Sequence, residues 1–334
     1  MVWGDGMIDF RYHVVSLAAA LMALAIGIVL GSGPLRTALV SSLSDETDLL
    51  RQEVADAKAQ TAAEELQGAV GRDFVDEAAP VLLADSLKDR KIAIILVFSP
   101  DEAEVTGMRD RLVEAGATVT GNLTIEPSWI DEGQAAFRAA FAAQIADSVV
   151  GVDATVAPDK VMAHALAQAL VPTESTVAAG PNDIADPTTA ADRATLLLNL
   201  LKDADFVSGT VTGSVDGVLI IAGPGAEDDD LHAAQSETMA ELAGILDAYD
   251  KGTVIASAAA VAEDIPTAIR SSSVLHANVT TVTESMNYFG RFAVALAMAK
   301  ELTGTASSYG YGEDLTLYPG PVAPTAAPAA TPAP

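Results

Sequence analysis

The chain has 334 residues, half of them hydrophobic, which is enough to bury a large core in about two domains. Its 46 Asp and Glu residues against 18 Lys and Arg residues give a net charge of −28. A surface this acidic repels phosphate backbones, so the composition argues against nucleic acid as a partner. The chain has no cysteine, which excludes disulfide bonds, thiolate metal sites and cysteine nucleophiles.

The first predicted element is a membrane-spanning helix over residues 14–33. Residues 14–30, VVSLAAALMALAIGIVL, carry no charge, and with the next three residues they reach the length that crosses a hydrocarbon layer of roughly 30 Å. The stretch is about twice as long as a buried strand, and Gly27, Gly31 and Gly33 lack the G-x-G-x-x-G spacing of a nucleotide loop. No A-x-A cleavage site follows, which favours an uncleaved anchor over a signal peptide.

We expect a single-pass protein of the cell membrane or cell envelope, in contact with membrane lipid. Residues 1–13 are predicted to be cytoplasmic and the C-terminal body to lie outside the cytoplasm. Arg11 and Arg36 flank the helix on opposite sides, so positive charge encodes the orientation only weakly. The orientation follows mainly from size, because the N-terminal segment is too short to be the working part of the protein.

Small residues recur every four positions along this helix, at Ala19, Ala23, Gly27 and Gly31. They share one helix face, and such a face lets two membrane helices pack closely. The alternative is that small residues are common in membrane helices, so that an Ala-rich stretch produces this spacing without any dimer.

Residues 34–70 are predicted to form a short parallel coiled coil. Beta-branched residues occupy the a positions and mostly leucine the d positions, a pattern that favours two parallel helices. Glutamates at g also precede basic residues at the following e positions. The repeat spans only about three heptads, so an amphipathic helix packed on its own domain is the alternative. The predicted homodimer interface consists of Ala23, Gly27, Gly31, Val40, Leu43, Thr47, Leu50, Val54 and Ala57.

Residues 71–304 alternate strand and helix patterns, which predicts an α/β body with a Rossmann-like, doubly wound parallel sheet. KIAIILVF, GVLIIAG and GTVIASA are continuous apolar runs, typical of parallel strands buried on both faces. ATVTGNLTI and HANVTTVT supply two further strands. Residues 305–334 end in PVAPTAAPAATPAP and are predicted to form a disordered Pro- and Ala-rich tail. The predicted helices cover residues 72–87, 101–116, 136–149, 158–170, 190–204, 230–249 and 286–304.

The sequence offers little for catalysis. It has no G-x-S-x-G, P-loop or zincin motif, and its four histidines, at positions 13, 164, 232 and 276, are scattered. GVLIIAGPGAEDDDLH indicates a strand, a Gly-Pro-Gly turn and a helix start, where a doubly wound sheet binds ligands. The aspartates at 228–230 would repel a pyrophosphate placed there. We therefore predict no enzymatic activity, and a hydrolase or nucleotide-binding enzyme is the least favoured function.

The same turn contains the candidate metal site, formed by Asp228, Asp230 and His232. Asp228 and His232 are four residues apart and share a helix face. Carboxylate and imidazole ligands suit Cu(II) better than Cu(I). The alternative needs no metal, because carboxylates at a helix start cap the helix and complement its dipole.

Several stretches resemble the actinobacterial MctB family of copper transport proteins. The most specific likeness is in MIDFRYHVVSLAAALMALAIGIVLGSG, and the pattern continues in RDFVDEAAPVLLADSLKDRKIAIILV and in TTVTESMNYFGRFAVALAMAKELTG with the SSYGYG beyond it. The resemblance implies a mycobacterial-type envelope protein that acts in copper efflux or tolerance, described as pore-forming in the outer membrane. It also implies relatives that act in cell separation as anchored coiled-coil partners of a cytoplasmic protein.

The pore description conflicts with the sequence. An outer-membrane barrel needs many alternating strands and aromatic girdles, whereas aromatics are 5% here and the predicted strands are continuously apolar. Copper efflux or tolerance is the first functional hypothesis, with copper as the one ligand considered and no cofactor identified. The alternative is a non-catalytic envelope scaffold or regulator of cell separation, a homodimer whose partner is a cytoplasmic or envelope protein.

Overall fold

A computed structural model describes residues 8–32, 34–152, 155–173, 189–250, 252–257, 263–285, 287–312 and 315–320. Within these ranges, the side chains of residues 8–9, 30, 32, 34–45 and 250 are left undescribed. The chain divides into two compact units, residues 1–71 and 72–334.

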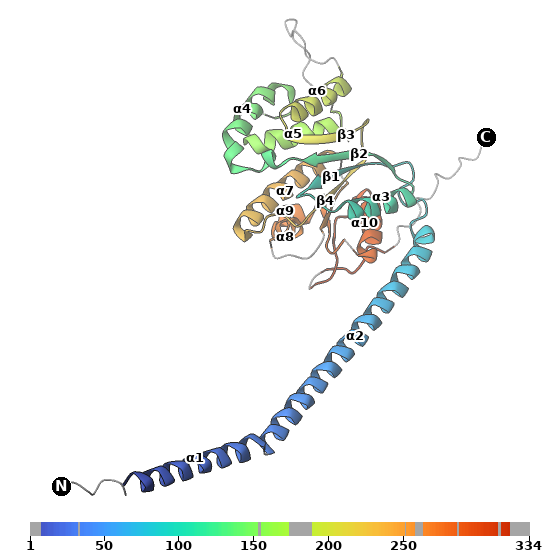
Figure 1. Cartoon of the computed structure of the whole chain (residues 1–334). Coiled ribbons are helices and arrows are strands. Elements are labelled where there is room, and N and C mark those ends of the chain that lie inside the picture. The colour runs from blue at the N-terminus through green and yellow to red at the C-terminus, as the bar shows by residue number, and fades with distance from the viewer. Residues whose placement is uncertain are drawn as a thin grey trace, which may run out of the picture. The chain divides into compact units, whose positions relative to one another are not determined.

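The first unit begins with the apolar helix α1 (Ile8–Ser32), the dark blue ribbon in Figure 1. Within it, Phe10–Val29 is long and apolar enough to cross a membrane, with a mean hydropathy of 2.1 and no residue buried by other parts of the chain. The apolar span starts four residues before the predicted 14–33, because Phe10 and Tyr12 extend the run. Helix α2 (Pro34–Leu82) follows, with proline at its first position, where the missing N–H is not needed.

Helix α2 continues beyond the predicted coil. Residues 72–82, predicted as the start of a separate helix, form its last turns and belong to the second unit. There Val75, Ala79 and, just after the helix, Leu83 are buried in the core, and Asp76 pairs with Arg111 of α3 (Glu102–Glu114). Pro80 cannot donate to the carbonyl of Asp76, and α2 ends two residues later.

The second unit is built on one seven-stranded sheet with the order β3-β2-β1-β4-β5-β6-β7. Neighbouring strands are parallel except for β2 and β3, which are antiparallel. The strands are β1 (Lys91–Val97), β2 (Thr118–Ile125), β3 (Val207–Val211), β4 (Gly217–Ala222), β5 (Thr253–Ser257), β6 (Thr280–Val282) and β7 (Ser308–Tyr309).

The sheet is therefore mixed, and the prediction of a purely parallel sheet is wrong at one edge. Strand β3 was not predicted because VSGTV contains serine, glycine and threonine and is only partly buried. The sheet also extends beyond Gly304, where we predicted the body to end, because β7 pairs with β6 and Tyr309 bridges to Thr316. Residues 321–334 of the predicted tail lie outside the described residues.

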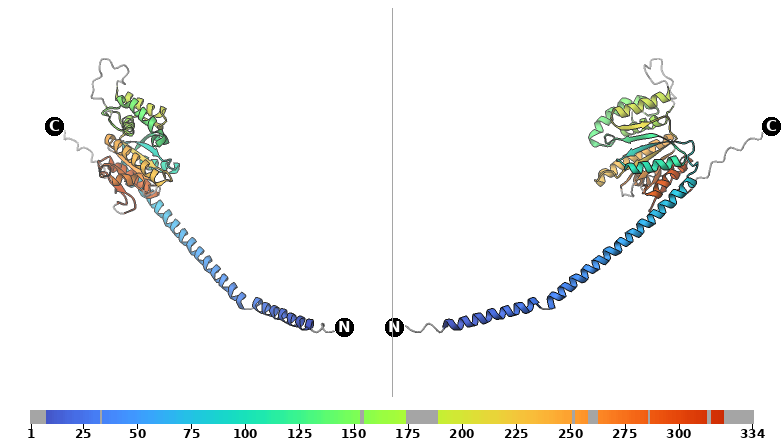
Figure 2. Two further views of the ribbon diagram at one scale, coloured as in Figure 1. Left: turned by 90° about the vertical axis from the view of Figure 1, so that its left-hand side faces the viewer. Right: turned by 45° about the vertical axis from the view of Figure 1, so that its right-hand side comes forward.

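Helices cover both faces of this sheet, as the two views of Figure 2 also show. Helices α4 to α8 share a core with one face, and α3, α10 and the last turns of α2 share a second core with the other. The remaining helices are α4 (Ala135–Ile145), α5 (Pro158–Leu170), α6 (Ala190–Asp203), α7 (Asp229–Asp250), α8 (Ile265–Ser271), α9 (Ser273–His276) and α10 (Tyr288–Glu301), with short 3-10 turns at Pro127–Trp129, Glu132–Gln134 and Ala146–Ser148. His276, predicted to lie in a strand, ends α9, because the Ser272 side chain caps that turn.

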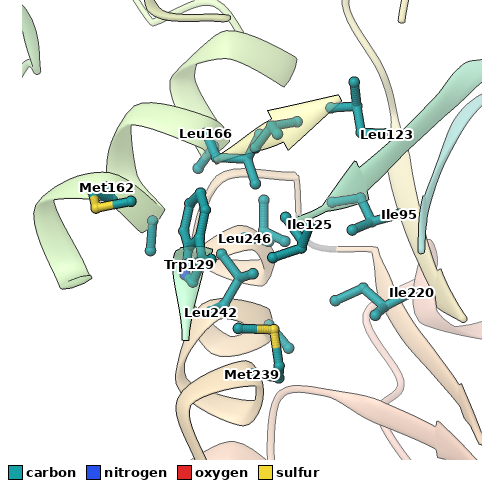
Figure 3. Close-up of a cluster of buried hydrophobic side chains, with 14 of the residues drawn as sticks. Ile95, Leu123, Ile125, Trp129, Met162, Leu166, Ile220, Met239, Leu242 and Leu246 are labelled. Carbon is teal, nitrogen blue, oxygen red and sulfur yellow. The ribbon is translucent and has the colours of Figure 1, made fainter. Parts of the chain in front are cut away.

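The first core is centred on Trp129, which Figure 3 shows between α5 and α7 beside the isoleucines of the sheet. Its ring meets Phe206 edge to face, with the ring centroids 6.4 Å apart. Both side chains are almost completely buried. Burying an aromatic side chain of this size contributes about 1.5–3 kcal/mol, so this cluster fixes α5 and α7 against the sheet.

Candidate functional site

The loop between β4 and α7, residues 223–228, lies at the carboxyl ends of the parallel strands, beside the end of β1. A Cβ atom on Gly223 would be 2.1 Å from the carbonyl oxygen of Phe98, so only glycine lets the loop approach β1 this closely. Phe98 and Ser99 both have positive φ angles, of 57° and 51°. From β1 the sheet continues to β2 on one side and to β4 on the other, and ligands of open α/β sheets bind where the strand order reverses.

The side chain of His232, in the first turn of α7, points into this loop. The residue is 7% exposed, and its ring centroid lies 5.8 Å from that of Phe98. A Cβ atom on Gly225 would be 2.1 Å from Nδ1, so the loop backbone covers this edge of the imidazole. Nδ1 is buried and has no hydrogen-bond partner among the described residues.

The aspartates of the predicted metal site lie on the surface. Asp228 Oδ1 accepts a hydrogen bond from the backbone N–H of Leu231 at 2.9 Å, which is the geometry of a helix N-cap. Asp230 in the first turn of α7 is exposed, so it complements the positive end of the helix dipole. Among the described residues, no group of three or more Asp, Glu or His side chains is placed to hold a metal ion. Asp228, Asp230 and the buried His232 thus do not form a ready three-ligand site.

The other histidines are separate from this loop. His164 on α5 makes a 3.0 Å hydrogen bond to the Tyr249 hydroxyl, which also accepts from Gln168 Nε2 at 3.0 Å. Burial lowers the pKa of the His164 imidazole below its usual value of 6.5. His276 is exposed on α9, and His13 belongs to α1.

A buried carboxyl group near the same edge of the sheet was not predicted. Glu104, in the first turn of α3, is almost fully buried. Burial raises the pKa of Glu104 above its usual value of 4.5, nearby Asp101 raises it further, and Arg291 of α10 opposes both. One weak signal for this residue is present in DEAEV, which places a third acidic residue on the helix face that also carries Val105 and Met108.

The predicted dimer interface is exposed wherever its side chains are described. Gly27 and Gly31 have open space around the position of a Cβ atom. On α2, Leu50 and Val54 are 56% and 52% exposed, and Thr47 and Ala57 are exposed beside them. Ala23 on α1 is exposed too. The side chains of Val40 and Leu43 lie outside the described residues.

Comparison with known proteins assigns the chain to a family. The family model described as copper transport outer membrane protein, MctB, matches residues 7–319. This chain belongs to the MctB family. The match confirms the resemblance stated from the sequence, and it includes both the apolar helix and the α/β body.

Curated MctB relatives agree with this assignment. Copper transporter MctB of Mycobacterium leprae (strain TN) is 24% identical over 319 residues, which cover 93% of this chain and 98% of that protein. The proteins of the same name from Mycobacterium bovis and from Mycobacterium tuberculosis (strain H37Rv) are each 27% identical over 129 residues, covering 39% of this chain and 41% of theirs. The names of the MctB family and of these relatives denote a transporter rather than an enzyme.

Proposed function

We propose that this chain is a membrane-anchored protein of the cell envelope that acts in copper efflux or tolerance without being an enzyme. The observation that carries the proposal is the MctB family match, which runs from the apolar helix to the end of the α/β body. The relative that matches over 98% of its own length is named as a copper transporter.

The proposed arrangement is a single-pass anchor with the body outside the cytoplasm. Support comes from α1, whose Phe10–Val29 span lies near the N-terminus, with the whole α/β body following it. A reporter enzyme that works only outside the cytoplasm, fused after Gly304, should be active. Activity of a cytoplasmic reporter at the same position would reverse the orientation.

We infer that two copies associate in parallel through α1 and through a short coiled coil in α2. The half-exposed Leu50 and Val54 support this, because apolar residues at helical spacing usually pack against another surface. The open faces of Gly27 and Gly31 support close approach of two α1 helices. We also infer a Rossmann-like body, since six of its strands follow the order 3-2-1-4-5-6 typical of doubly wound sheets, with β3 reversed.

For a direct contact with copper, we keep Asp228, Asp230 and His232 as the proposed site. Its support is the buried Nδ1 of His232, which has no hydrogen-bond partner among the described residues. Because Gly225 covers Nδ1, the loop must open before an ion reaches it. Titration of the full chain in detergent with Cu(II) should show weak binding that His232→Ala reduces. His276→Ala, which changes an exposed histidine, is the matched control, and equal binding by the two variants would reject the site.

The decisive experiment for the function is copper tolerance of a strain that lacks the gene. The full chain should restore growth in copper, whereas a chain without the α1 span or without the α/β body should not. Normal copper tolerance of the deletion strain would overturn the copper proposal. The exposed α2 surface then favours the second function, a scaffold that acts in cell separation, whose loss should appear as unseparated cells.

A further inference from the structure

An aromatic groove crosses the second unit between the end of α2, the start of α10 and the segment after β7. Its volume is about 400 Å³. Five of the residues that line it are aromatic, although aromatics make up only 5% of the chain. The aromatic groove is lined by Phe74, Val75, Ala78, Leu82, Phe289, Phe292, Tyr311, Leu317 and Tyr318.

Much of this lining remains in contact with solvent. Phe74 is 68% exposed and Tyr318 is 50% exposed, and Leu317 is comparably open. By contrast, the side chains of Trp129 and Phe206 in the first core are almost completely buried. Contiguous apolar surface of this kind on a folded domain usually marks a place where another segment binds. The described part of the chain does not supply that segment.

We propose that the Pro- and Ala-rich tail, residues 321–334 of the same chain, binds in the aromatic groove as a polyproline II segment. The tail starts three residues after Tyr318, so it leaves the described structure beside the groove. Its sequence, PVAPTAAPAATPAP, contains five prolines and no charged side chain. Aromatic-lined grooves recognise Pro-rich segments because the extended helix is already ordered and loses little entropy on binding.

The chemistry of the groove fits this occupant. A polyproline II segment has no internal hydrogen bonds and offers its carbonyl oxygens, to which phenol groups such as those of Tyr311 and Tyr318 can donate. The pyrrolidine rings supply apolar surface that packs against Phe74 and Phe289. A tail without charged side chains also meets little repulsion from an acidic protein, whereas an anionic lipid surface would meet the net charge of −28.

The geometry allows the tail to fold back. Gly320 has a φ angle of 68°, which permits a turn at the point where the tail begins, and a Cβ there would meet open space. At about 3.1 Å per residue, the tail spans roughly 43 Å in a polyproline II conformation, which is ample for reversal and binding. Because the tail is attached within a few residues of the groove, its effective concentration there is on the order of millimolar. This favours the chain's own tail over that of a second copy.

The test measures binding of a fluorescent peptide of residues 319–334 to two proteins in detergent. One is the intact chain, and the other is a shortened chain that stops after Gly320. The shortened chain should bind the peptide, and the intact chain should bind it at least tenfold more weakly because its own tail occupies the groove. Fluorescence anisotropy measures both affinities. Failure of the shortened chain to bind overturns the proposal, and so does equal binding by the intact chain, which would indicate docking between copies.

Variants then locate the binding surface. In the shortened chain, Phe289→Ala and Leu317→Ala should each weaken peptide binding about tenfold, whereas Val274→Ala, an exposed apolar residue on α9, should not. Leu317 lies after the last strand and is largely exposed, so its replacement leaves both cores intact. A peptide with every proline changed to alanine should bind poorly. Equal affinity of that peptide, or unchanged binding by both groove variants, would reject polyproline recognition in this groove.

Discussion

The imidazole of His232 lies so close to Gly225 that a Cβ atom on residue 225 would be 2.1 Å from Nδ1. Gly225 also has a φ angle of 74°, a conformation that side chains disfavour. Gly213 has the same φ angle but open space around it. Alanine substitutions at these two glycines therefore distinguish the cost of backbone strain from the cost of steric contact with His232.

Gly225→Ala should destabilise the protein more than Gly213→Ala. The backbone strain alone costs about 1–2 kcal/mol in either variant. At residue 225 the histidine must also move, which adds about 1–3 kcal/mol, as overpacking does. Chemical denaturation of the two variants measures the difference. Equal losses would mean that His232 moves aside without cost.

The stability of the wild-type protein should fall as the pH drops below about 6.5. Burial lowers the pKa of His164, so the unfolded chain binds a proton in a range where the folded chain does not. The stabilisation is complete above the unfolded pKa and is lost as the pH falls through the lower folded one. His164→Gln should remove this slope, and His276→Gln, an exposed control, should keep it. An unchanged slope in His164→Gln would assign the effect to another group.

Glu104 should make the folded protein less stable as the pH rises from about 4.5, which is the opposite of the effect of His164. The pKa of Glu104 is raised in the folded protein. Its contribution to stability is therefore complete below about pH 4.5 and is lost as the pH rises through the pKa of the folded state. Glu104→Gln keeps the neutral form at every pH, so its stability relative to the wild type should increase between pH 4.5 and 7. Glu102→Gln, exposed in the same helical turn, is the control. A decrease over this range would show that the ionised form is favoured by Arg291.

A cysteine introduced at Leu50 should form a disulfide with its own copy in membranes. Leu50 is a d position in the proposed coiled coil, and d residues of parallel helices face each other. The chain has no native cysteine, so the product reports one position. Gln52 lies on the opposite face of the frame and is the control. Equal crosslinking from residues 50 and 52, measured on a non-reducing gel, would argue against the heptad interface.

The elements with strong periodic signals were predictable from the sequence. Helix α5 has the predicted bounds, because Pro158 starts it and a regular apolar stripe follows. Strands β1, β4 and β5 coincide with the continuous apolar runs, since burial on both faces leaves no polar position. Strands β3 and β7 gave no such signal, because one is polar and half exposed and the other has two residues.

The candidate site was predictable only in part. The sequence placed the turn after β4 and recognised that its aspartates can cap α7, and Asp228 does so. The burial of His232 could not be predicted, because it depends on Phe98 after β1 and Gly225 after β4 both lying against the imidazole. The aromatic groove depends in the same way on segments far apart in the chain.

Both edge strands of the sheet are short, which bears on how the body meets other copies of itself. Strand β7 has two residues, and Thr316 bridges Tyr309 next to it. Strand β3 has five, including glycine, and runs against the direction of its neighbour. Short, irregular edges offer few aligned N–H and C=O groups to another chain, which protects against sheet-to-sheet aggregation. If copies associate through their helices as proposed, these edges keep their sheets from joining into fibres.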